Sequence, residues 1–146
     1  KSRGGSHGIG KIASNAACDL DVMYFATCDE YGNKHIGGTA QLVEHSYESS
    51  VYRATGYFTD ETDNNHYFPY ENKFDKVFTK DTRGLKIVIP YLRENFNDDK
   101  EIVRAICDNF FLSIYQNKLK VKYNEVLIDK ENIETIINNA DYYEQE

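Results

Sequence analysis

The sequence predicts an α+β fold, in which an antiparallel sheet carries helices on one of its faces. Runs of apolar residues with strand-like alternation are joined by turn sequences such as "DEYGNK", which is typical of antiparallel hairpins. Apolar residues recur at helical spacing most clearly over residues 98–118. Because the strands follow one another without intervening helices, an alternating α/β fold with a parallel sheet is excluded.

Length and composition limit the classes of protein to consider. The 146 residues suit one domain or a large part of one, and the missing initial Met predicts that the chain begins inside a longer protein. The net charge of −7 argues against a general nucleic-acid-binding surface. No apolar run approaches the roughly 20 residues that span a bilayer, so no membrane partner is expected. Three cysteines without a C-x-x-C pair, and four scattered histidines, predict a reducing cytoplasm and no metal site.

The first strand, residues 22–27, is expected at the centre of the sheet because both of its faces are mostly apolar. Val22, Tyr24 and Ala26 alternate with Met23, Phe25 and Thr27. In the return strand, Gly37-Gly38 indicates either a β-bulge or a close backbone approach. In chain order, the expected elements are a helix at 10–18, strands at 22–27, 35–45 and 51–59, a surface connection at 60–82, a strand at 84–92, a helix at 98–118, a hairpin at 118–128 and a helix at 130–140.

The helix at 98–118 is expected to bury a stripe of apolar residues formed by Ile102, Ile106, Phe110 and Ile114, widened by Val103 and Phe111. Asp98 or Asp99 can cap its start. The following hairpin is expected to turn at Asn124-Glu125, and Asp129 is expected to cap the last helix.

The segment "GGSHGIGK", residues 4–11, is the strongest candidate for function. From Gly5 it fits G-x-x-x-x-G-K, the P-loop pattern, except that Ile12 stands where Mg²⁺ needs a Ser or Thr hydroxyl. A P-loop also requires a parallel sheet, whereas residues 22–27 lead into a hairpin. Two other interpretations remain: a glycine-rich lid that binds phosphate, and a flexible end that precedes a helix cap.

A glycine-rich lid could bind phosphate without the missing hydroxyl. Gly4, Gly5, Gly8 and Gly10 let the backbone turn its N–H groups toward phosphate oxygens, and the helix start adds its dipole. Lys11 could add a positive charge and Ser6 a hydroxyl. His7 either contacts a phosphate or fills a variable position.

Two stretches resemble the GHKL ATPases, a group that includes heat-shock chaperones, DNA gyrase B and histidine kinases. "GGSHGIGKIASNAACDLDVMYFAT" is similar to their last nucleotide-binding motif, G-x-x-G-x-G followed by a helix of small residues and a strand. "TRGLKIVIPYL" resembles their R-G-T-x-I-x-L strand, but Leu85 stands where the family commonly has a Thr that helps to bind the adenine region. The first stretch also resembles large bacterial GHKL-type proteins associated with antiviral defence.

The resemblance implies an incomplete Bergerat-type two-layer sandwich that binds ATP with Mg²⁺. Residues 1–115 would be the C-terminal part of the ATP-binding domain, and residues 116–146 its extension. The family's E-x-x-x-N helix and D-x-G-x-G loop, which activate water and hold Mg²⁺ and adenine, would lie upstream, so no catalytic residue or metal ligand is expected in this chain.

Lid closure would be sensed by a second subunit or a partner domain. The alternative is a non-catalytic interaction or scaffold module that keeps the fold without the nucleotide. The residues that the resemblance assigns to nucleotide binding are Gly4, Gly5, Ser6, His7, Gly8, Ile9, Gly10, Lys11 and Leu85.

Overall fold

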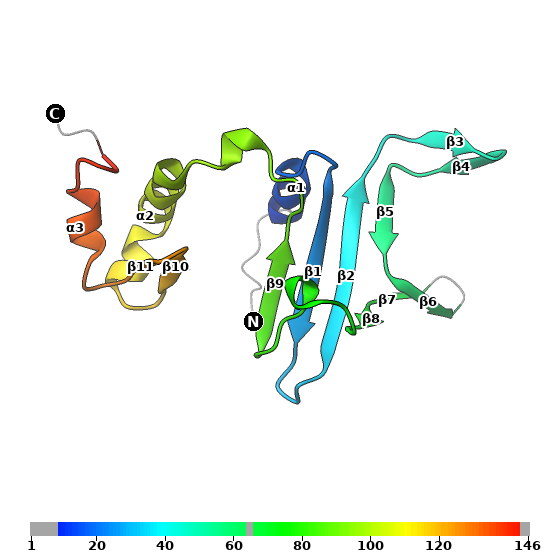
Figure 1. Ribbon diagram of the computed structural model, residues 1–146, viewed down its shortest axis with the longest axis horizontal. Helices are drawn as coiled ribbons and strands as arrows, with labels where there is room; N and C mark the ends of the chain where they lie inside the picture. The colour runs from blue at the N-terminus through cyan, green and yellow to red at the C-terminus, as the bar shows by residue number, and fades with distance from the viewer. Residues whose placement is uncertain (1–8, 64–65, 144–146) are drawn as a thin grey trace. The chain divides into compact units, whose positions relative to one another are not determined.

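The computed structural model describes residues 9–63 and 66–143, with side chains described for 13–60 and 66–143. The chain divides into two compact units, residues 1–93 and residues 94–146 (Figure 1). This division falls earlier than the expected boundary after residue 115. It groups helix α2 (Asp99–Tyr115) with the C-terminal hairpin and helix, and leaves the main sheet in the first unit.

The first unit is built on an antiparallel sheet with the strand order β5 (Thr55–Phe58), β2 (Lys34–Gln41), β1 (Val22–Cys28), β9 (Gly84–Val88). A short strand, β8 (Tyr70–Glu71), also pairs with β2. Every strand pairing in the described part of the chain is antiparallel. The α+β class is therefore confirmed, and so is the central place of β1, which pairs with β2 and β9.

Helix α1 (Ile9–Ala16) packs against one face of this sheet. The buried side chain of Asn15 holds the helix in place by hydrogen bonds. Asn15 is only 1% exposed, and its Nδ2 donates to the carbonyl oxygens of Asp21 at 2.8 Å and Thr39 at 3.0 Å. The Thr39 hydroxyl donates back to Asn15 Oδ1 at 3.1 Å. The helix begins one residue before the expected position and ends two residues earlier than expected.

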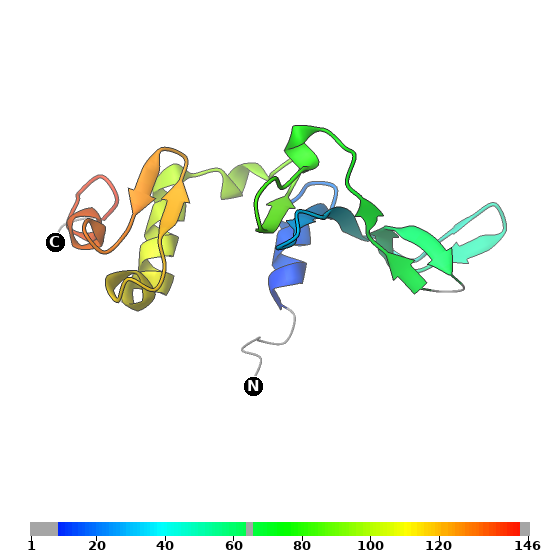
Figure 2. The ribbon, with the colours of Figure 1, turned by 90° about the horizontal axis from the view of Figure 1, so that it is seen from below.

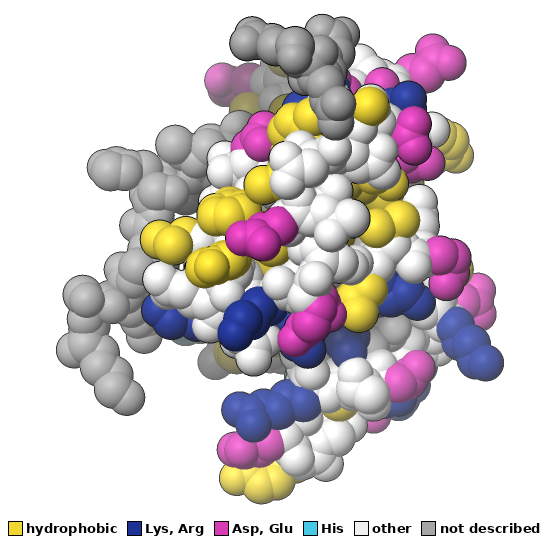
Figure 3. Space-filling model, turned by 90° about the vertical axis from the view of Figure 1, so that its left-hand side faces the viewer, with side chains coloured by type: hydrophobic (Ala, Val, Ile, Leu, Met, Phe, Trp, Pro, Cys, Tyr) yellow, Lys and Arg dark blue, Asp and Glu magenta, His cyan; other side chains and the backbone are white. Residues whose placement is uncertain are grey.

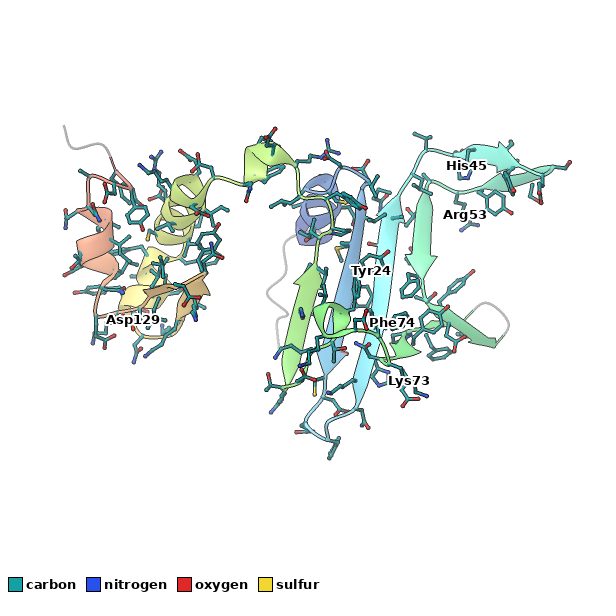
Figure 4. The ribbon with its side chains drawn as sticks, viewed as in Figure 1. Tyr24, His45, Arg53, Lys73, Phe74 and Asp129 are labelled. Atoms are coloured by element: carbon teal, nitrogen blue, oxygen red, sulfur yellow. The ribbon has the colours of Figure 1, made fainter. Side chains whose placement is uncertain are left out.

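The opposite face of the sheet is covered by an aromatic layer and by the 3₁₀ turn η1 (Lys76–Phe78); Figure 2 shows α1 and η1 on opposite sides. Tyr24 contacts Phe58 and Phe78 edge-to-face, with ring centroids 5.6 and 5.4 Å apart. Phe74 adds an edge contact to Phe58 at 5.8 Å (Figure 4). Such aromatic pairs add directional stabilisation to the burial of their area.

The glycine pair in β2 marks a close approach and no bulge. The β1–β2 register runs without interruption from Val22↔Ala40 to Cys28↔Lys34. A Cβ on Gly38 would lie 2.9 Å from the Met23 carbonyl oxygen, and a Cβ on Gly37 would lie 2.6 Å from Phe25 Cζ. The Phe25 ring therefore occupies the space that a side chain at Gly37 would take.

The expected strand at 51–59 is two strands with different partners. Its first part is β4 (Ser50–Tyr52), which pairs with β3 (His45–Tyr47) in an exposed two-stranded ribbon that leaves the sheet (Figure 1). Its second part is β5, which pairs with β2. The expected return strand at 35–45 likewise ends with β2 at Gln41 before β3 begins.

The segment expected as a plain surface connection, residues 60–82, contains further short elements. Strands β6 (Asp60–Asp63) and β7 (His66–Phe68) form another small hairpin, and β8 and η1 follow. The expected strand at 84–92 is shorter, because β9 ends at Val88 and the chain returns to pairing only at an isolated bridge between Cys18 and Leu92.

The second unit contains η2 (Glu94–Phe96), α2, the hairpin β10 (Val121–Tyr123) and β11 (Val126–Ile128), and α3 (Ile133–Ile137). Asp98 caps α2 as expected, accepting from the backbone N–H groups of Lys100 and Glu101. The hairpin turns at Asn124, whose φ is +50°. The core consists of Val103, Cys107, Ile114, Ile128, Ile133 and Ile136.

Two expectations for this unit are wrong in detail. Phe110 was expected in the buried stripe of α2 but is 49% exposed, because the buried face runs through Val103, Cys107 and Ile114. Asp129 does not cap α3, since the helix begins later and its N-cap residue is Asn132. Asp129 accepts instead from the Glu131 N–H, in the turn that precedes the helix.

The structure also describes the charged surface and the environment of the cysteines. Figure 3 shows basic and acidic side chains interspersed over the face in view. All three cysteines are buried and free. Among the residues that the structure describes, no helix is both long and apolar enough to cross a bilayer.

Candidate functional site

The structure describes only part of the predicted nucleotide-binding segment. Gly4, Gly5, Ser6, His7 and Gly8 lie outside the described residues. Ile9, Gly10 and Lys11 form the first turn of α1, where only their backbone is described. The other predicted site residue, Leu85, lies in β9 at the edge of the sheet, with 58% of its surface exposed.

The sheet register shows that Leu85 and α1 share one face of the sheet. Side chains directly opposite each other on antiparallel strands point to the same face, and they alternate along each strand. Leu85 is opposite Thr27, which lies four residues from Met23 on β1, and Met23 is opposite Thr39. Thr39 bonds to Asn15 of α1. The helix that follows the glycine-rich segment therefore lies on the face that carries Leu85.

Two rows of side chains lie on this face beyond the Met23–Thr39 pair. The nearer row is Ile87, Phe25 and Gly37, and the farther row is Leu85, Thr27 and His35. Leu85 and Ile87 are 58% and 45% exposed, whereas Phe25, Thr27 and His35 are half-buried. This end of the face, the β9–β1–β2 surface, thus presents apolar side chains at one edge and polar side chains toward β2.

Two polar groups on the β9–β1–β2 surface have no protein partner within the described part of the chain. The Nδ1 atom of His35 is buried and makes no hydrogen bond there. The Thr27 hydroxyl takes part in none of the side-chain hydrogen bonds among the described residues. Buried polar groups are normally hydrogen-bonded, so His35 Nδ1 is an exception among the described residues.

Two of the lysines near this end of the sheet are paired with carboxylates. Lys34 points to the opposite face and bonds to Asp81 at 2.5 Å. This hydrogen bond raises the pKa of Lys34 and lowers the pKa of Asp81. Glu71, which is opposite His35 on β8, forms an exposed ion pair with Lys73 at 3.3 Å (Figure 4).

A metal site is not formed by the described side chains. Among them, no three His, Cys, Asp or Glu residues come close enough to hold a metal ion.

The surroundings of β1 do not match a P-loop. In a P-loop protein the strand after the phosphate-binding helix belongs to a parallel sheet. Here β1 follows α1 and is antiparallel to both of its neighbours. The glycine-rich lid and the flexible end remain as interpretations of residues 4–8.

Thr27 and His35 were not identified as site residues from the sequence. The alternation placed Thr27 on one face with Met23 and Phe25, but it could not show that Leu85 lies beside it. The two residues are 58 positions apart, and their pairing depends on the register between β1 and β9. A hydroxyl and an imidazole at neighbouring strand ends are also too common in sequences to indicate a site.

Comparison with known proteins adds no family assignment. No family model, no curated protein and no solved structure matches the chain.

Proposed function

We propose that this chain supplies the phosphate-lid half of a GHKL-type ATP-binding domain, whose ATP hydrolysis drives a conformational change in a larger protein. One observation carries the proposal. The two stretches that resemble the family come together on one face of the sheet, because α1 packs on the face that carries Leu85. The proposal extends to the kind of larger protein, which would be one of the GHKL-type proteins associated with antiviral defence.

The proposed architecture is an incomplete Bergerat-type sandwich, with a nucleotide between a helical layer and the sheet. An antiparallel sheet with α1 on one face supports this arrangement. The β9–β1–β2 surface extends beyond the Met23–Thr39 pair to which α1 is fastened, which leaves sheet area for further helices and a ligand.

In this proposal the chain's own residues bind phosphate and close over it. The glycines at 4, 5, 8 and 10 allow backbone N–H groups to face phosphate oxygens, with help from the Ser6 hydroxyl and the Lys11 charge. Mg²⁺ supplies charge neutralisation when bound, and its ligands come from outside residues 1–146.

The test is calorimetric titration of the full-length protein with ATP and Mg²⁺. Gly8→Ala and Gly10→Ala should weaken ATP binding, since a Cβ restricts the backbone of the lid. Gly56→Ala is a matched control: its added Cβ would meet only the Cβ of Ala40 at 3.6 Å, an ordinary contact. Absence of ATP binding by the wild type would refute the proposed function. Equal binding by the wild type and both lid variants would refute the role of the glycines.

A second candidate is a non-catalytic interaction module that keeps the fold without the nucleotide. The exposed ribbon β3–β4 favours it, because Tyr47, Val51 and Tyr52 are 61%, 70% and 47% exposed. His45 stacks on Tyr52 with ring centroids 5.5 Å apart, which pre-forms an aromatic surface (Figure 4). In the same titration, a folded protein that shows no ATP binding would support the interaction module.

A further inference from the structure

We propose that the ribbon β3–β4 pairs with the same ribbon of a second copy of this chain, through the outer edge of β4. The two ribbons would form a four-stranded antiparallel sheet around a twofold axis, with Val51 of each copy directly opposite the other. The inference concerns how two copies associate, so it goes beyond ATP binding and does not depend on it.

The ribbon is short and exposed in the described part of the chain. β3 and β4 have three residues each, all six are exposed, and no third strand pairs with them among the described residues. A two-stranded hairpin of this kind is at best marginally stable in water. The turn adds strain, because Glu48 and Ser49 have φ angles of +45° and +67°, a region that favours glycine or asparagine. A partner that adds strands would stabilise the ribbon.

The register shows which backbone groups of β4 face away from β3. Tyr47 and Ser50 flank the two-residue turn, and such a pair exchanges both of its hydrogen bonds across the ribbon. The next pair, Ser46 and Val51, therefore directs its N–H and C=O groups outward. On the β4 side these are the groups of Val51. Two antiparallel copies of β4 can join them, N–H to C=O and C=O to N–H, with Val51 at the centre.

The exposed side chains of the ribbon fit this pairing. Val51 is 70% exposed, and in the dimer it would lie against Val51 of the other copy. Tyr47 and Tyr52 are 61% and 47% exposed on the other face of the ribbon, where His45 stacks on Tyr52 (Figure 4). The four-stranded sheet would bring the aromatic side chains of both copies together on one face, and cross-strand pairs of this kind stabilise sheets.

Charge favours the edge of β4 over the edge of β3. Two β3 strands paired about Ser46 would place Glu44 of one copy opposite Glu48 of the other, because these residues flank β3 at equal distances. Like charges directly opposite each other destabilise a strand pair. Pairing of β4 about Val51 instead brings Arg53 next to the turn that contains the partner's Glu48.

The two charges of that contact are available in the structure. Arg53 directly follows β4 and Glu48 lies in the turn, and both side chains are exposed (Figure 4). Neither belongs to an ion pair among the described side chains. Because the axis is twofold, the contact occurs twice in the dimer. Short strands bury a small area, so we expect the dimer to dissociate readily on dilution.

The first experiment tests the register by disulfide cross-linking of the full-length protein. Val51→Cys should form a covalent homodimer under mild oxidation, since directly opposite residues on antiparallel strands lie within the distance that a disulfide spans. Ser46→Cys is the matched control, because Ser46 is opposite Val51 in the ribbon and is also exposed. In the proposed sheet the two Ser46 positions are three strand spacings apart, roughly 14 Å, which is too far for a disulfide.

The outcomes of this experiment separate the possible occupants of the β4 edge. The three cysteines of the chain are buried and free, and the wild type gives the background level of cross-linking. We expect a cross-linked dimer of Val51→Cys and only the background level for Ser46→Cys. Cross-linking of Ser46→Cys alone, or equal cross-linking of both variants, would overturn the inference. So would background levels for both, which is the outcome if the ribbon binds a different protein.

The second experiment tests the contact between Arg53 and Glu48. Arg53→Glu, added to Val51→Cys, should slow the initial rate of cross-linking several-fold, because like charges then face each other across the interface. Further addition of Glu48→Arg restores opposite charges and should restore the rate. An Arg53→Glu variant that cross-links as fast as Val51→Cys alone, or no recovery with Glu48→Arg, would contradict the proposed pairing.

Discussion

Single residues determine how closely the strands of the main sheet can approach. A Cβ on Gly38 would lie 2.9 Å from the Met23 carbonyl oxygen and 3.2 Å from Phe58 Cβ. Neither atom can move without displacing a strand. A Cβ on Gly37 would instead meet the far end of the half-buried Phe25 ring, which can rotate away. The two adjacent glycines therefore differ in how much substitution they tolerate.

We predict that Gly38→Ala lowers the free energy of unfolding by about 1–3 kcal/mol, the typical effect of overpacking. Gly37→Ala should cost less, and Gly56→Ala should cost least because its Cβ has room beside Ala40. Urea denaturation of the three variants measures the order. A Gly38→Ala protein as stable as Gly56→Ala would contradict the close approach in the structure.

A second residue-scale prediction concerns the turn between β1 and β2. Asp29 Oδ1 accepts from the N–H groups of Tyr31 and Asn33, and Oδ2 accepts from Asn33 Nδ2, each at 2.8 Å. The side chain of Asn33 is the largest cause of a pKa for Asp29 below the ordinary value of 3.8. Since the pKa is lowered on folding, the carboxylate stabilises the turn above pH 3.8 and loses this effect as the pH falls through the folded pKa.

Asn33→Ala should therefore raise the pKa of Asp29 toward 3.8. An NMR titration of the side-chain carboxyl carbons measures the change. Asp81 serves as an internal reference, because its pKa is lowered mainly by Lys34 and should not move. An unchanged Asp29 titration would show that Asn33 is not the cause.

At the scale of elements, the sequence predicted a strand well where the whole apolar run belongs to the main sheet. The two apolar faces of β1 correctly indicated a central strand. The segment 51–59 was misread as one strand because alternation does not reveal partners: β4 pairs with β3 and β5 pairs with β2. The strands within 60–82 were missed because they are short and mostly exposed, so little apolar pattern marks them.

The helix α2 shows a related limit. Its start was predictable, because an Asp before a helix satisfies the free N–H groups of the first turn. Its buried face was displaced from the expected one, since Cys107 is buried and Phe110 is half exposed. Helical spacing allows several overlapping stripes, and the packing against α3 and the β10–β11 hairpin selects among them.

The Asp98 cap gives a prediction at this scale. Asp98→Ala should destabilise the second unit by about 1 kcal/mol, because the N–H groups of Lys100 and Glu101 lose their acceptor. Asp98→Asn should be nearly neutral, since the amide oxygen can still accept. Urea denaturation followed by circular dichroism compares the two variants. Equal stability of Asp98→Ala and the wild type would contradict the cap.

At the scale of the whole molecule, the sequence located only part of the candidate site. The glycine pattern and the strand around Leu85 were identified by resemblance to a family. Thr27 and His35 could not be identified in this way, because their place beside Leu85 follows from the register across three strands. His35 and Leu85 are 50 residues apart in the sequence. Local patterns specify elements, whereas a binding surface depends on which elements become neighbours.

The division of the chain into residues 1–93 and 94–146 leads to the last prediction. Each unit has its own stabilising contacts: the Asn15–Thr39 bonds and the aromatic layer in the first, and the cluster around Ile114 and Ile128 in the second. If the units unfold independently, a variant should affect only the unit that contains it. Amide hydrogen exchange in low urea should show faster exchange of β1 and β2 in Gly38→Ala and of α2 in Asp98→Ala, with the other unit unchanged. Faster exchange in both units for either variant would show that the chain unfolds as one cooperative domain.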